Sequence, residues 1–570
     1  MLCRDQIPCN RSIVWACGSQ LVQQPPIPIL RVPIRQIGCP LPQGTKTKGS
    51  RPSPGSLSRP TAVESIPALD PPRSDLARIA LIILTLIGIL QVTSKNRPGH
   101  MLTFSDSVAT RHCDGLSRRS FLKAGFLGIG SLTLADLLKV ESQQSAPTKK
   151  AFINIHLDGG PPQMDMIDPK PEAPREFRGE FDSIRTVIPG FHVSELMPKT
   201  AQIANQLSFI RSLVGAESRH DAFQCLSGFG DKDLASIGGR PAMGSILTKL
   251  YEQHTTGAPA YVDLLQGRAL VRNSARPGFL GPTYTPFRPD ISHLFHRELE
   301  PGMVKELDRL GKGHQTSLRL GPGIDAGRLD DRVQLLNRLD RVRRKIDSSP
   351  MMAAMDAFTQ QAFSILTSGK IAAAMDLSQE DPKVVARYTP PFPDRPDRFY
   401  TSEGPDAAKK LLLARRLIEA GVRCVSVSLS DFDTHSKNFS RMKDLVPIVD
   451  HALHALVTDL SERGMLDEVT IVAWGEFGRT PTINSNGGRD HWPRVAMAIL
   501  AGGGMVPGQV IGATDRYAGE PTDRPVHYQD VLATVYHNLG INARHTTLTD
   551  TTGRPQYLLD KGSPIRELVG

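Results

Sequence analysis

Apolar runs alternate with amphipathic segments along the C-terminal three quarters of this chain. Buried strands are predicted at 151–157, 207–213, 424–429, 469–474 and 495–500, and helices at 407–420, 445–463 and 528–539. Gly421 and Gly464 directly follow two of these helices and act as stop signals. Strands that are apolar throughout and alternate with helices are typical of sheets covered on both faces. The pattern therefore predicts an α/β fold with a mostly parallel sheet flanked by helices.

A segment at about 285–405 departs from this alternation. It is rich in Arg, Asp and Pro and contains a charged stretch, 328–346, that predicts one helix. We interpret it as an insertion that forms a cap over the edge of the sheet. The domain organisation expected from sequence is therefore one α/β domain over 150–570, interrupted by this inserted region.

The residues before that domain contain a pair of adjacent arginines followed by an apolar stretch. Arg118 and Arg119 are followed by Phe121-Leu122-Lys123 and then by the apolar stretch 124–138. Two adjacent arginines ahead of a weakly apolar run predict a twin-arginine signal within 101–149. The protein is then a substrate of the twin-arginine translocase and is periplasmic or extracellular. The alternative interpretation is an ordinary basic helix start.

The first hundred residues have an unusual composition. They hold 14 of the 45 prolines and four of the seven cysteines. Met101 stands where an export signal normally begins, so we expect translation to start there and 1–100 to be an over-called extension. The alternative is a disordered leader with an apolar run at 79–92, which is shorter than the roughly 20 residues needed to span a bilayer.

The positive charge of the chain lies mainly outside the predicted domain. The net charge is +10, but residues 1–100 carry 12 basic and 4 acidic residues, and 101–150 carry 7 and 4. Residues 151–570 therefore hold 49 basic and 50 acidic residues. This near-neutral body gives no electrostatic reason to expect nucleic acid as a partner. Only Cys225 and Cys424 lie in it, so one disulfide is allowed, and the apolar context of Cys424 predicts burial.

Acidic, histidine and arginine residues gather where the predicted strands end. The groups are Asp158, Asp165 and Asp168 after the first strand; Asp431, Asp433 and His435 after 424–429; Glu476 and Arg479 after 469–474; and Arg489, Asp490 and His491 before 495–500. Ligands of α/β sheets bind beyond the carboxyl ends of strands. Asp, Glu and His are ligands for divalent metals, and an arginine beside them can hold an oxyanion. Together the groups predict a metal site.

Each group also has a purely structural interpretation. Asp433-Thr-His435 can be a turn with a helix cap, and Gly475 to Pro481 can be a turn held by a Glu476–Arg479 ion pair. Residues 489–493 can be a surface loop with a buried tryptophan. His156, inside an apolar strand, is expected to be a core histidine, and Asp158 can be a turn residue. His220-Asp221 can simply cap a helix.

Several of these motifs resemble those of one bacterial family. They are Asp158-Gly-Gly-Pro161 with Asp165 and Asp168-Pro-Lys-Pro171, Asp433-Thr-His435, Gly475-Glu-Phe-Gly-Arg-Thr-Pro481, Gly488-Arg-Asp-His-Trp-Pro493 and Asp523-Arg-Pro525. The family consists of exported proteins of unknown function and belongs to the alkaline phosphatase and sulfatase superfamily. The resemblance runs from the export signal to the end of the chain and implies an alkaline phosphatase-like domain at 150–570.

The resemblance also implies roles for individual residues. The superfamily typically holds one or two metals between Asp and His ligands at strand ends. By analogy the metal ligands here are Asp433, His435, Glu476, Asp490 and His491, with Asp165 as a weaker candidate. Arg479 and Arg489 would hold the anion during catalysis. Mixed carboxylate and imidazole ligands suit Zn, Mn, Mg or Ca, and the sequence does not choose among them.

The chain departs from the superfamily pattern at the nucleophile. Neither Cys225-Leu-Ser-Gly nor Cys424-Val-Ser-Val matches the Cys-x-Pro-x-Arg motif that yields formylglycine, so an ordinary sulfatase is not expected. Ser218 and Ser227 flank the expected position of a nucleophile without a diagnostic context. Pro162 removes a backbone donor from the first turn, which argues against anion binding there.

Two functions remain open at this point. The first is a secreted, sulfatase-like, metal-dependent hydrolase of sulfate or phosphate esters, with a sulfated or phosphorylated polysaccharide as a candidate partner. The second is a non-catalytic envelope or polysaccharide-binding protein on the same fold. The acid–histidine groups favour the first, and the missing nucleophile favours the second.

Overall fold

The computed structural model describes residues 150–570 apart from 221, 235–237, 252–256, 266–274, 292–293, most of 296–349, and 392–402. The predicted leader, the export signal and nearly all of the charged helix predicted at 328–346 lie outside the described residues. None of the helices in the described part is both long and apolar enough to cross a membrane.

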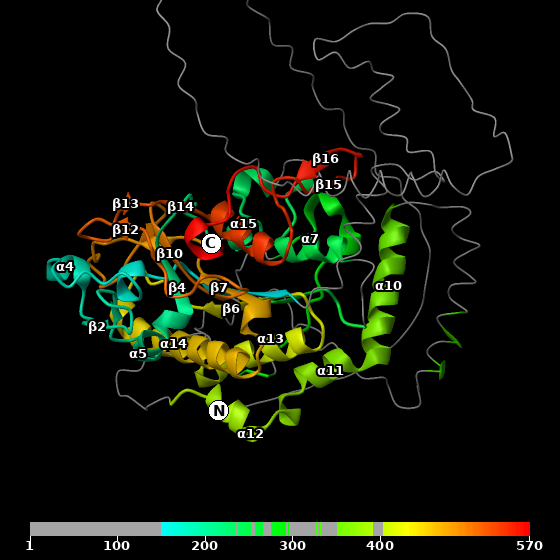
Figure 1. Ribbon diagram of the computed structural model, residues 1–570, viewed down its shortest axis with the longest axis horizontal. Coiled ribbons are helices and arrows are strands. Elements are labelled where there is room, and N and C mark those ends of the chain that lie inside the picture. The colour runs from blue at the N-terminus through cyan, green and yellow to red at the C-terminus, as the bar shows by residue number, and fades with distance from the viewer. Residues whose placement is uncertain are drawn as a thin grey trace, which may run out of the picture. The chain divides into compact units, whose positions relative to one another are not determined.

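An eight-stranded mixed sheet forms the centre of the described region (Figure 1). Its order is β11-β4-β10-β7-β1-β6-β5, with β14 also paired to β4. The strands are β1 Ala151–Asp158, β4 Leu207–Val214, β5 Tyr261–Leu264, β6 Cys424–Ser430, β7 Val469–Trp474, β10 Ala496–Gly502, β11 Val510–Ile511 and β14 Val526–His527. All pairs are parallel except those of β10, which runs antiparallel to both β4 and β7. The predicted α/β class with a mostly parallel sheet is confirmed.

The direction of β10 matters for the site. Parallel strands β4, β7, β1 and β6 all end at one edge of the sheet, here called the carboxyl edge. Because β10 is antiparallel to its neighbours, it begins at that same edge, with Ala496 opposite Leu213 near the end of β4. The residues just before β10 therefore join those that follow the other strands.

Helices cover both faces of the sheet (Figure 1). One face packs on α5 Pro198–Gln202, α13 Lys409–Glu419 and α14 Asn438–Glu462, and the other on α6 Phe223–Ser227, α7 Met243–Leu250 and α15 Tyr528–Asn538. In β1, Ile153, Ile155 and Leu157 enter the first of these cores and Phe152 the second. Burying each such side chain contributes about 1.5–3 kcal/mol. The face of Phe152 also carries the buried polar residues Asn154 and His156, so β1 is buried on both faces but apolar on only one.

Most of the described part of the predicted insertion is helical. It contains α10 Pro350–Ser368, α11 Lys370–Met375 and α12 Pro382–Arg387. Ile365 of α10 and Ile371 of α11 are buried in the same core as α13 and α14. The Ser368 hydroxyl donates to the carbonyl of Gly257, close to edge strand β5. This region thus packs beside the β5 edge of the sheet.

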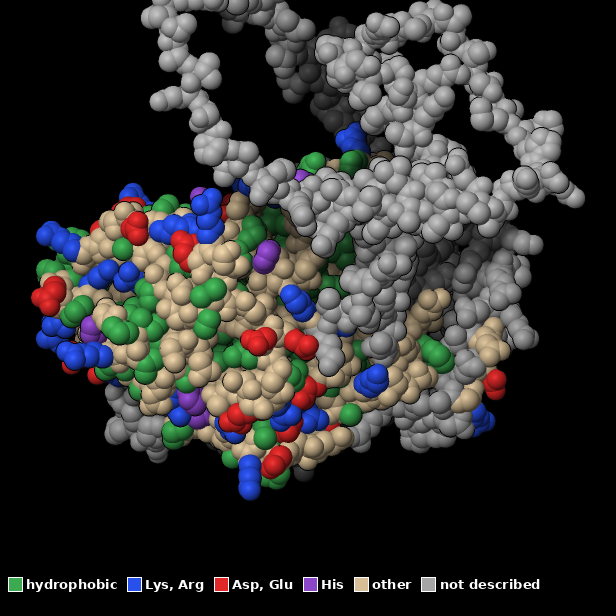
Figure 2. All heavy atoms as spheres, viewed as in Figure 1, with side chains coloured by type: hydrophobic (Ala, Val, Ile, Leu, Met, Phe, Trp, Pro, Cys, Tyr) green, Lys and Arg blue, Asp and Glu red, His purple; other side chains and the backbone are tan. Residues whose placement is uncertain are grey.

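Small elements complete the fold. They are α4 Arg175–Arg178, α16 Arg566–Val569 and the two-stranded ribbons β2 Ser183–Arg185 with β3 His192–Ser194, β8 Gly478–Arg479 with β9 His491–Trp492, β12 Ala513–Thr514 with β13 Pro521–Asp523, and β15 Thr547–Thr549 with β16 Pro555–Tyr557. Cys225 and Cys424 are both buried, and no disulfide joins them. On the face shown in Figure 2, basic and acidic side chains are interspersed rather than gathered by sign.

Candidate metal centre

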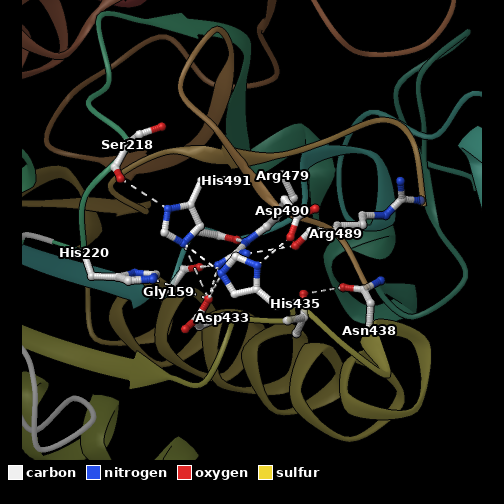
Figure 3. A network of polar contacts seen from close by, with 12 residues as sticks. Gly159, Ser218, His220, Asp433, His435, Asn438, Arg479, Arg489, Asp490 and His491 are labelled. Carbon is white, nitrogen blue, oxygen red and sulfur yellow. Dashed lines mark hydrogen bonds and ion pairs between the residues drawn. The ribbon is translucent and has the colours of Figure 1, made fainter. Parts of the chain in front are cut away.

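Four side chains from separate parts of the sequence meet at the carboxyl edge (Figure 3). Asp433 and His435 lie between β6 and α14, His491 lies in β9 just before β10, and His220 follows β4. One ligand atom from each of the four lies within 4.8 Å of the others. We call these four residues the histidine cluster.

The local backbone is shaped to bring these loops together. Asp431, directly after β6, has a φ of 93°, which is unfavourable for a residue with a side chain and turns the chain sharply towards Asp433. Gly159 at the end of β1 packs against this turn, and a Cβ there would lie 2.4 Å from the backbone nitrogen of Asp433. Gly488 is equally close to the backbone of His435, where a Cβ would lie 2.2 Å from the carbonyl group. Only glycine permits both approaches.

The three imidazole rings all direct Nε2 towards one carboxylate oxygen, Oδ1 of Asp433. The distances to this atom are 3.0 Å from His435, 3.4 Å from His220 and 3.7 Å from His491. The Nε2 atoms of His435 and His491 lie 3.1 Å apart. For ligand atoms about 2.1 Å from a tetrahedral ion, the expected separation is about 3.4 Å. The observed distances lie on both sides of this value.

The other nitrogen of each ring contacts an oxygen that accepts hydrogen bonds. Nδ1 of His220 lies 2.9 Å from Oε1 of Glu476, and Nδ1 of His435 lies 2.6 Å from Oδ1 of Asp490. Nδ1 of His491 lies 3.2 Å from the backbone carbonyl oxygen of Ser218. Each oxygen favours a hydrogen on Nδ1 and so leaves the Nε2 lone pair facing the cluster. Histidines that bind metals usually have this arrangement.

The donor set fits a divalent cation. With hydrogens on Nδ1, the Nε2 atoms of His435 and His491 point lone pairs at each other over 3.1 Å, beside a carboxylate. A cation between them converts this repulsion into attraction. Three imidazole nitrogens and one carboxylate are ligands that suit zinc and other transition metals. The sequence-based expectation of a His/Asp metal site thus has a geometric counterpart, although the metal is not identified.

Electrostatics at the cluster favour positive charge. Burial lowers the pKa of His220, but its contacts with Asp433 and Glu476 outweigh burial and raise this pKa to about 9. Burial raises the pKa of Asp433, but the nearby His220, His491 and Arg479 outweigh it and hold this pKa far below its usual range. Both shifts show that an ionised Asp433 attracts positive charge to this position.

Glu476 connects the histidine cluster to a second, fully buried group. Its Oε1 accepts hydrogen bonds from the backbone nitrogen of Gly159 and from His220, both at 2.9 Å. Its Oε2 lies 3.6 Å from Nε2 of His156, which lies 3.7 Å from Asp158. His156, Asp158 and Glu476, the buried triad, are also close enough to share a cation. Glu476 therefore supports the first group and belongs to the second.

His156 is the core histidine that the sequence suggested, but its surroundings are acidic. Its side chain is completely buried. Burial lowers its pKa, but Asp158 and Glu476, together with Cys225, more than compensate and raise this pKa well above the usual value. A positive charge between the two carboxylates therefore stabilises the triad.

Arg479 lies beside the cluster, and four of its five N–H groups donate hydrogen bonds within the protein. Its Nη2 donates to Asp433 at 2.9 Å and to the carbonyl of Gly159, its Nε to Gly160 at 3.1 Å, and its Nη1 to the carbonyl of Arg489 at 2.9 Å. The side chain is fully buried. Arg479 positions the Asp433 carboxylate and fastens it to the turn after β1.

Asp165 and Arg489 contact each other, away from the histidine cluster. Nε and Nη2 of Arg489 donate to the two oxygens of Asp165 at 3.0 and 3.1 Å, and Asn438 adds a third hydrogen bond at 2.8 Å. Both side chains are buried. The structure therefore gives the predicted weak ligand and the predicted anion-binding arginine a shared structural contact, and neither enters the histidine cluster.

Comparison with known proteins gives a family but not an activity. A family model described as "Protein of unknown function (DUF1501)" matches residues 149–569. The chain belongs to this family. No curated protein is detectably similar to it in sequence.

Solved structures that are similar to this DUF1501 protein include two hydrolases. One is the PsFucS1 sulfatase from Pseudoalteromonas sp., with 12% identity over 72% of each chain and a TM-score of 0.32. Another is the phosphonate monoester hydrolase of Agrobacterium radiobacter, with 14% identity over 74% of this chain and 77% of that chain, and a TM-score of 0.30. Both similarities are distant.

The two serines suggested as nucleophiles do not direct their hydroxyls at the histidine cluster of this DUF1501 protein. Ser218 contacts His491 through its backbone carbonyl, and its other oxygen points away from the cluster in Figure 3. The hydroxyl of Ser227 donates to the carbonyl of Phe223 at 2.8 Å and accepts from the backbone of Phe229. The Ser227 hydroxyl is thus hydrogen-bonded within its own segment, and the Ser218 hydroxyl is not directed at the cluster.

The sequence did not single out His220 as a metal ligand. It follows β4 by six residues in a loop without a recognisable motif. His220 could have been found from the predicted topology. β4 was predicted as a strand, and a histidine that follows a strand of a parallel sheet is a candidate for the carboxyl edge. Asp490 and Glu476, in turn, contact Nδ1 atoms and support the rings.

Proposed function

We propose that this protein is a metal-dependent hydrolase of sulfate or phosphate esters. The observation that carries the proposal is the convergence of three Nε2 atoms on the Asp433 carboxylate, each ring being fixed through Nδ1 by a separate oxygen. Such preorganisation is typical of a site that holds a metal in a defined geometry.

The residues have distinct tasks in this proposal. His220, His435, His491 and Asp433 would hold the ion, while Glu476, Asp490 and Arg479 fix their orientation. A bound divalent cation would supply Lewis acidity towards an ester oxygen and activation of water. With the Nε2 protons displaced by the metal, three neutral rings and one carboxylate would leave a divalent site with net positive charge, which attracts an oxyanion. Since the hydroxyls of Ser218 and Ser227 are not directed at the cluster, we propose water as the attacking group.

Metal content and turnover together test the proposal. Full-length protein is produced with export intact, its metal is quantified by mass spectrometry, and hydrolysis of 4-nitrophenyl sulfate and 4-nitrophenyl phosphate is measured. We expect about one transition-metal ion per chain at the histidine cluster and turnover of at least one ester. Asp433→Asn should remove both, because it deletes the charge on which the rings converge. Metal-loaded protein that hydrolyses neither ester would contradict the hydrolase.

That negative result would favour the second function, a non-catalytic envelope protein that binds metal or polysaccharide. One observation supports this alternative. Arg479 and Arg489, the two arginines expected to bind the anion, direct all their described hydrogen bonds to Asp433, Asp165 and backbone carbonyls. Bound metal without turnover is the result that separates the two functions.

Export through the twin-arginine translocase is a further part of the proposal. Replacing Arg118 and Arg119 together by Lys should leave the precursor in the cytoplasm, since the translocase recognises the arginine pair. Cell fractionation and immunoblotting measure this. As a control, Arg111→Lys, outside the motif, should be exported normally. Equal export of the double variant, or export in a strain without the translocase, would show that the signal was misidentified.

A further inference from the structure

A separate cavity lies directly beside the histidine cluster. It has a volume of about 410 Å³ and is formed by α4, by β9 and the loop that connects β8 to β9, and by the turn between β12 and β13. Three of its lining residues are aromatic: Phe177, Trp492 and Tyr517. We call it the aromatic pocket. Asp490 forms one of its walls, and the same carboxylate contacts Nδ1 of His435.

The polar lining of the aromatic pocket consists mostly of hydrogen-bond acceptors. It includes the carboxylates of Asp490, Asp515 and Glu520 and the side chains of two threonines and Asn484, and its described lining has no Lys or Arg. An anion is therefore disfavoured inside the pocket itself. Ligands that donate hydrogen bonds, such as alcohols or amines, match this lining.

The charges around the pocket argue against a cationic amine. Each carboxylate already has a partner: Asp490 contacts His435, Glu520 pairs with Arg494, and Asp515 accepts from backbone nitrogens of the turn. Arg516 lies 4.5 Å from the ring centre of Tyr517, and Arg494 lies 5.2 Å from that of Trp492. Each of these rings thus already has an arginine beside it, and the charge of that arginine would repel a second cation but not a neutral ligand.

We propose that the aromatic pocket binds a neutral sugar ring of a saccharide substrate. The apolar atoms of the aromatic lining, next to lone pairs of already paired carboxylates, match a ring that has C–H groups on its faces and hydroxyl groups at its edge. The part of this inference that concerns catalysis rests on the proposed function: the sugar would be the alcohol component of an ester whose charged group faces the histidine cluster across Asp490. Sugar binding itself requires neither metal nor turnover.

Tryptophan fluorescence provides a local measurement. The chain has three tryptophans, Trp15, Trp474 and Trp492. Trp474 is fully buried, whereas Trp492 lines the pocket. The full-length protein is titrated with cellohexaose, laminarihexaose, mannohexaose and neutral agaro-hexaose, each with and without EDTA. We expect a saturable change in tryptophan fluorescence for at least one sugar, and the change should be equal with and without EDTA. Trp492→Phe should abolish the change, which assigns it to the pocket.

Calorimetry with substituted proteins tests the site itself. Tyr517→Ala and Trp492→Ala should each weaken binding of the responding sugar at least fivefold. The matched control is Tyr557→Ala, an exposed aromatic residue outside the pocket, and it should bind like the unsubstituted protein. Near-ultraviolet circular dichroism from buried Trp474 confirms folding. Absence of any saturable response, full binding by both pocket variants, or tighter binding of choline than of every sugar would overturn the proposal.

These outcomes are independent of those for hydrolysis. Sugar binding without ester turnover would leave the pocket assignment in place and refute the hydrolase. Turnover of aryl esters without sugar binding would support the hydrolase and refute the pocket assignment.

Discussion

Replacing His435 or His491 by Ala is expected to lower zinc affinity by at least about 100-fold. Each variant loses one of the four ligand atoms at the cluster, and changes in merely supporting residues typically cost 10–100-fold. Asp490→Asn, which changes only the partner of His435 Nδ1, should fall in that smaller range of about 10–100-fold. Competition titration with a chromogenic zinc chelator measures all three affinities.

A histidine outside the cluster serves as the control. His545 is exposed in the C-terminal region, and His545→Ala should retain the affinity of the unsubstituted protein. Thermal unfolding adds a second test. At metal concentrations about 100 times the dissociation constant, binding should stabilise the unsubstituted protein by about 2.7 kcal/mol, and EDTA should remove this. If the variants lose the same stability with and without EDTA, the histidines are structural and the metal hypothesis fails.

The core of the fold was accessible from sequence because its strands are buried on both faces. Strand β7 begins and ends at the residues predicted, and β1, β4 and β6 each extend only one residue further. Helix α14 begins at Asn438, seven residues before the predicted start at 445. Pro447 explains the difference: proline is tolerated in the first turn, so the sequence favours a start next to it. The polar segment before it contributes Phe439 and Met442 to the core and extends the helix.

The direction of β10 could not be derived from its residues. An apolar strand reads the same in both directions, and the β8–β9 ribbon that reverses the chain has only two residues in each strand. Yet this direction brings His491 to the carboxyl edge. Strand β5 has only four residues, which is too short for a recognisable hydrophobic pattern, and it was not predicted.

The residue types at the candidate site were accessible, but their individual roles were not. Asp433, His435 and His491 were predicted as ligands, and the structure brings them together with His220. A carboxylate can either point into the cluster as a ligand or contact the Nδ1 atom of a histidine, and the direction of its side chain decides which. Sequence spacing does not determine it, as Asp490 and Glu476 illustrate. Asp165 and Arg489 are 324 positions apart, so their pairing could not be read from sequence.

Removing one partner of the buried Asp165–Arg489 pair is expected to destabilise the fold. Arg489→Met or Asp165→Asn should each destabilise the protein by about 3–5 kcal/mol, because removing one partner leaves the other charge buried and uncompensated. Urea unfolding measures the loss. The double variant Asp165→Asn/Arg489→Met should be less destabilised than the sum of the two, since no isolated charge remains. Additive losses would contradict the coupling.

An exposed ion pair provides the comparison. Arg387 and Glu462 contact each other at 2.6 Å on the surface, and removing either should cost about 0–1 kcal/mol.

The Arg489 variants should also bind metal more weakly, because Arg489 lies two residues before His491. Its Nη1 and Nη2 also hold the carbonyls of Thr480 and Phe177 at 3.1 and 2.8 Å. Losing these contacts frees the loop that carries His491 to the cluster. Arg387→Ala should leave metal affinity unchanged. If Arg489→Met unfolds more easily yet binds zinc with full affinity, the pair stabilises the fold without positioning the metal ligands.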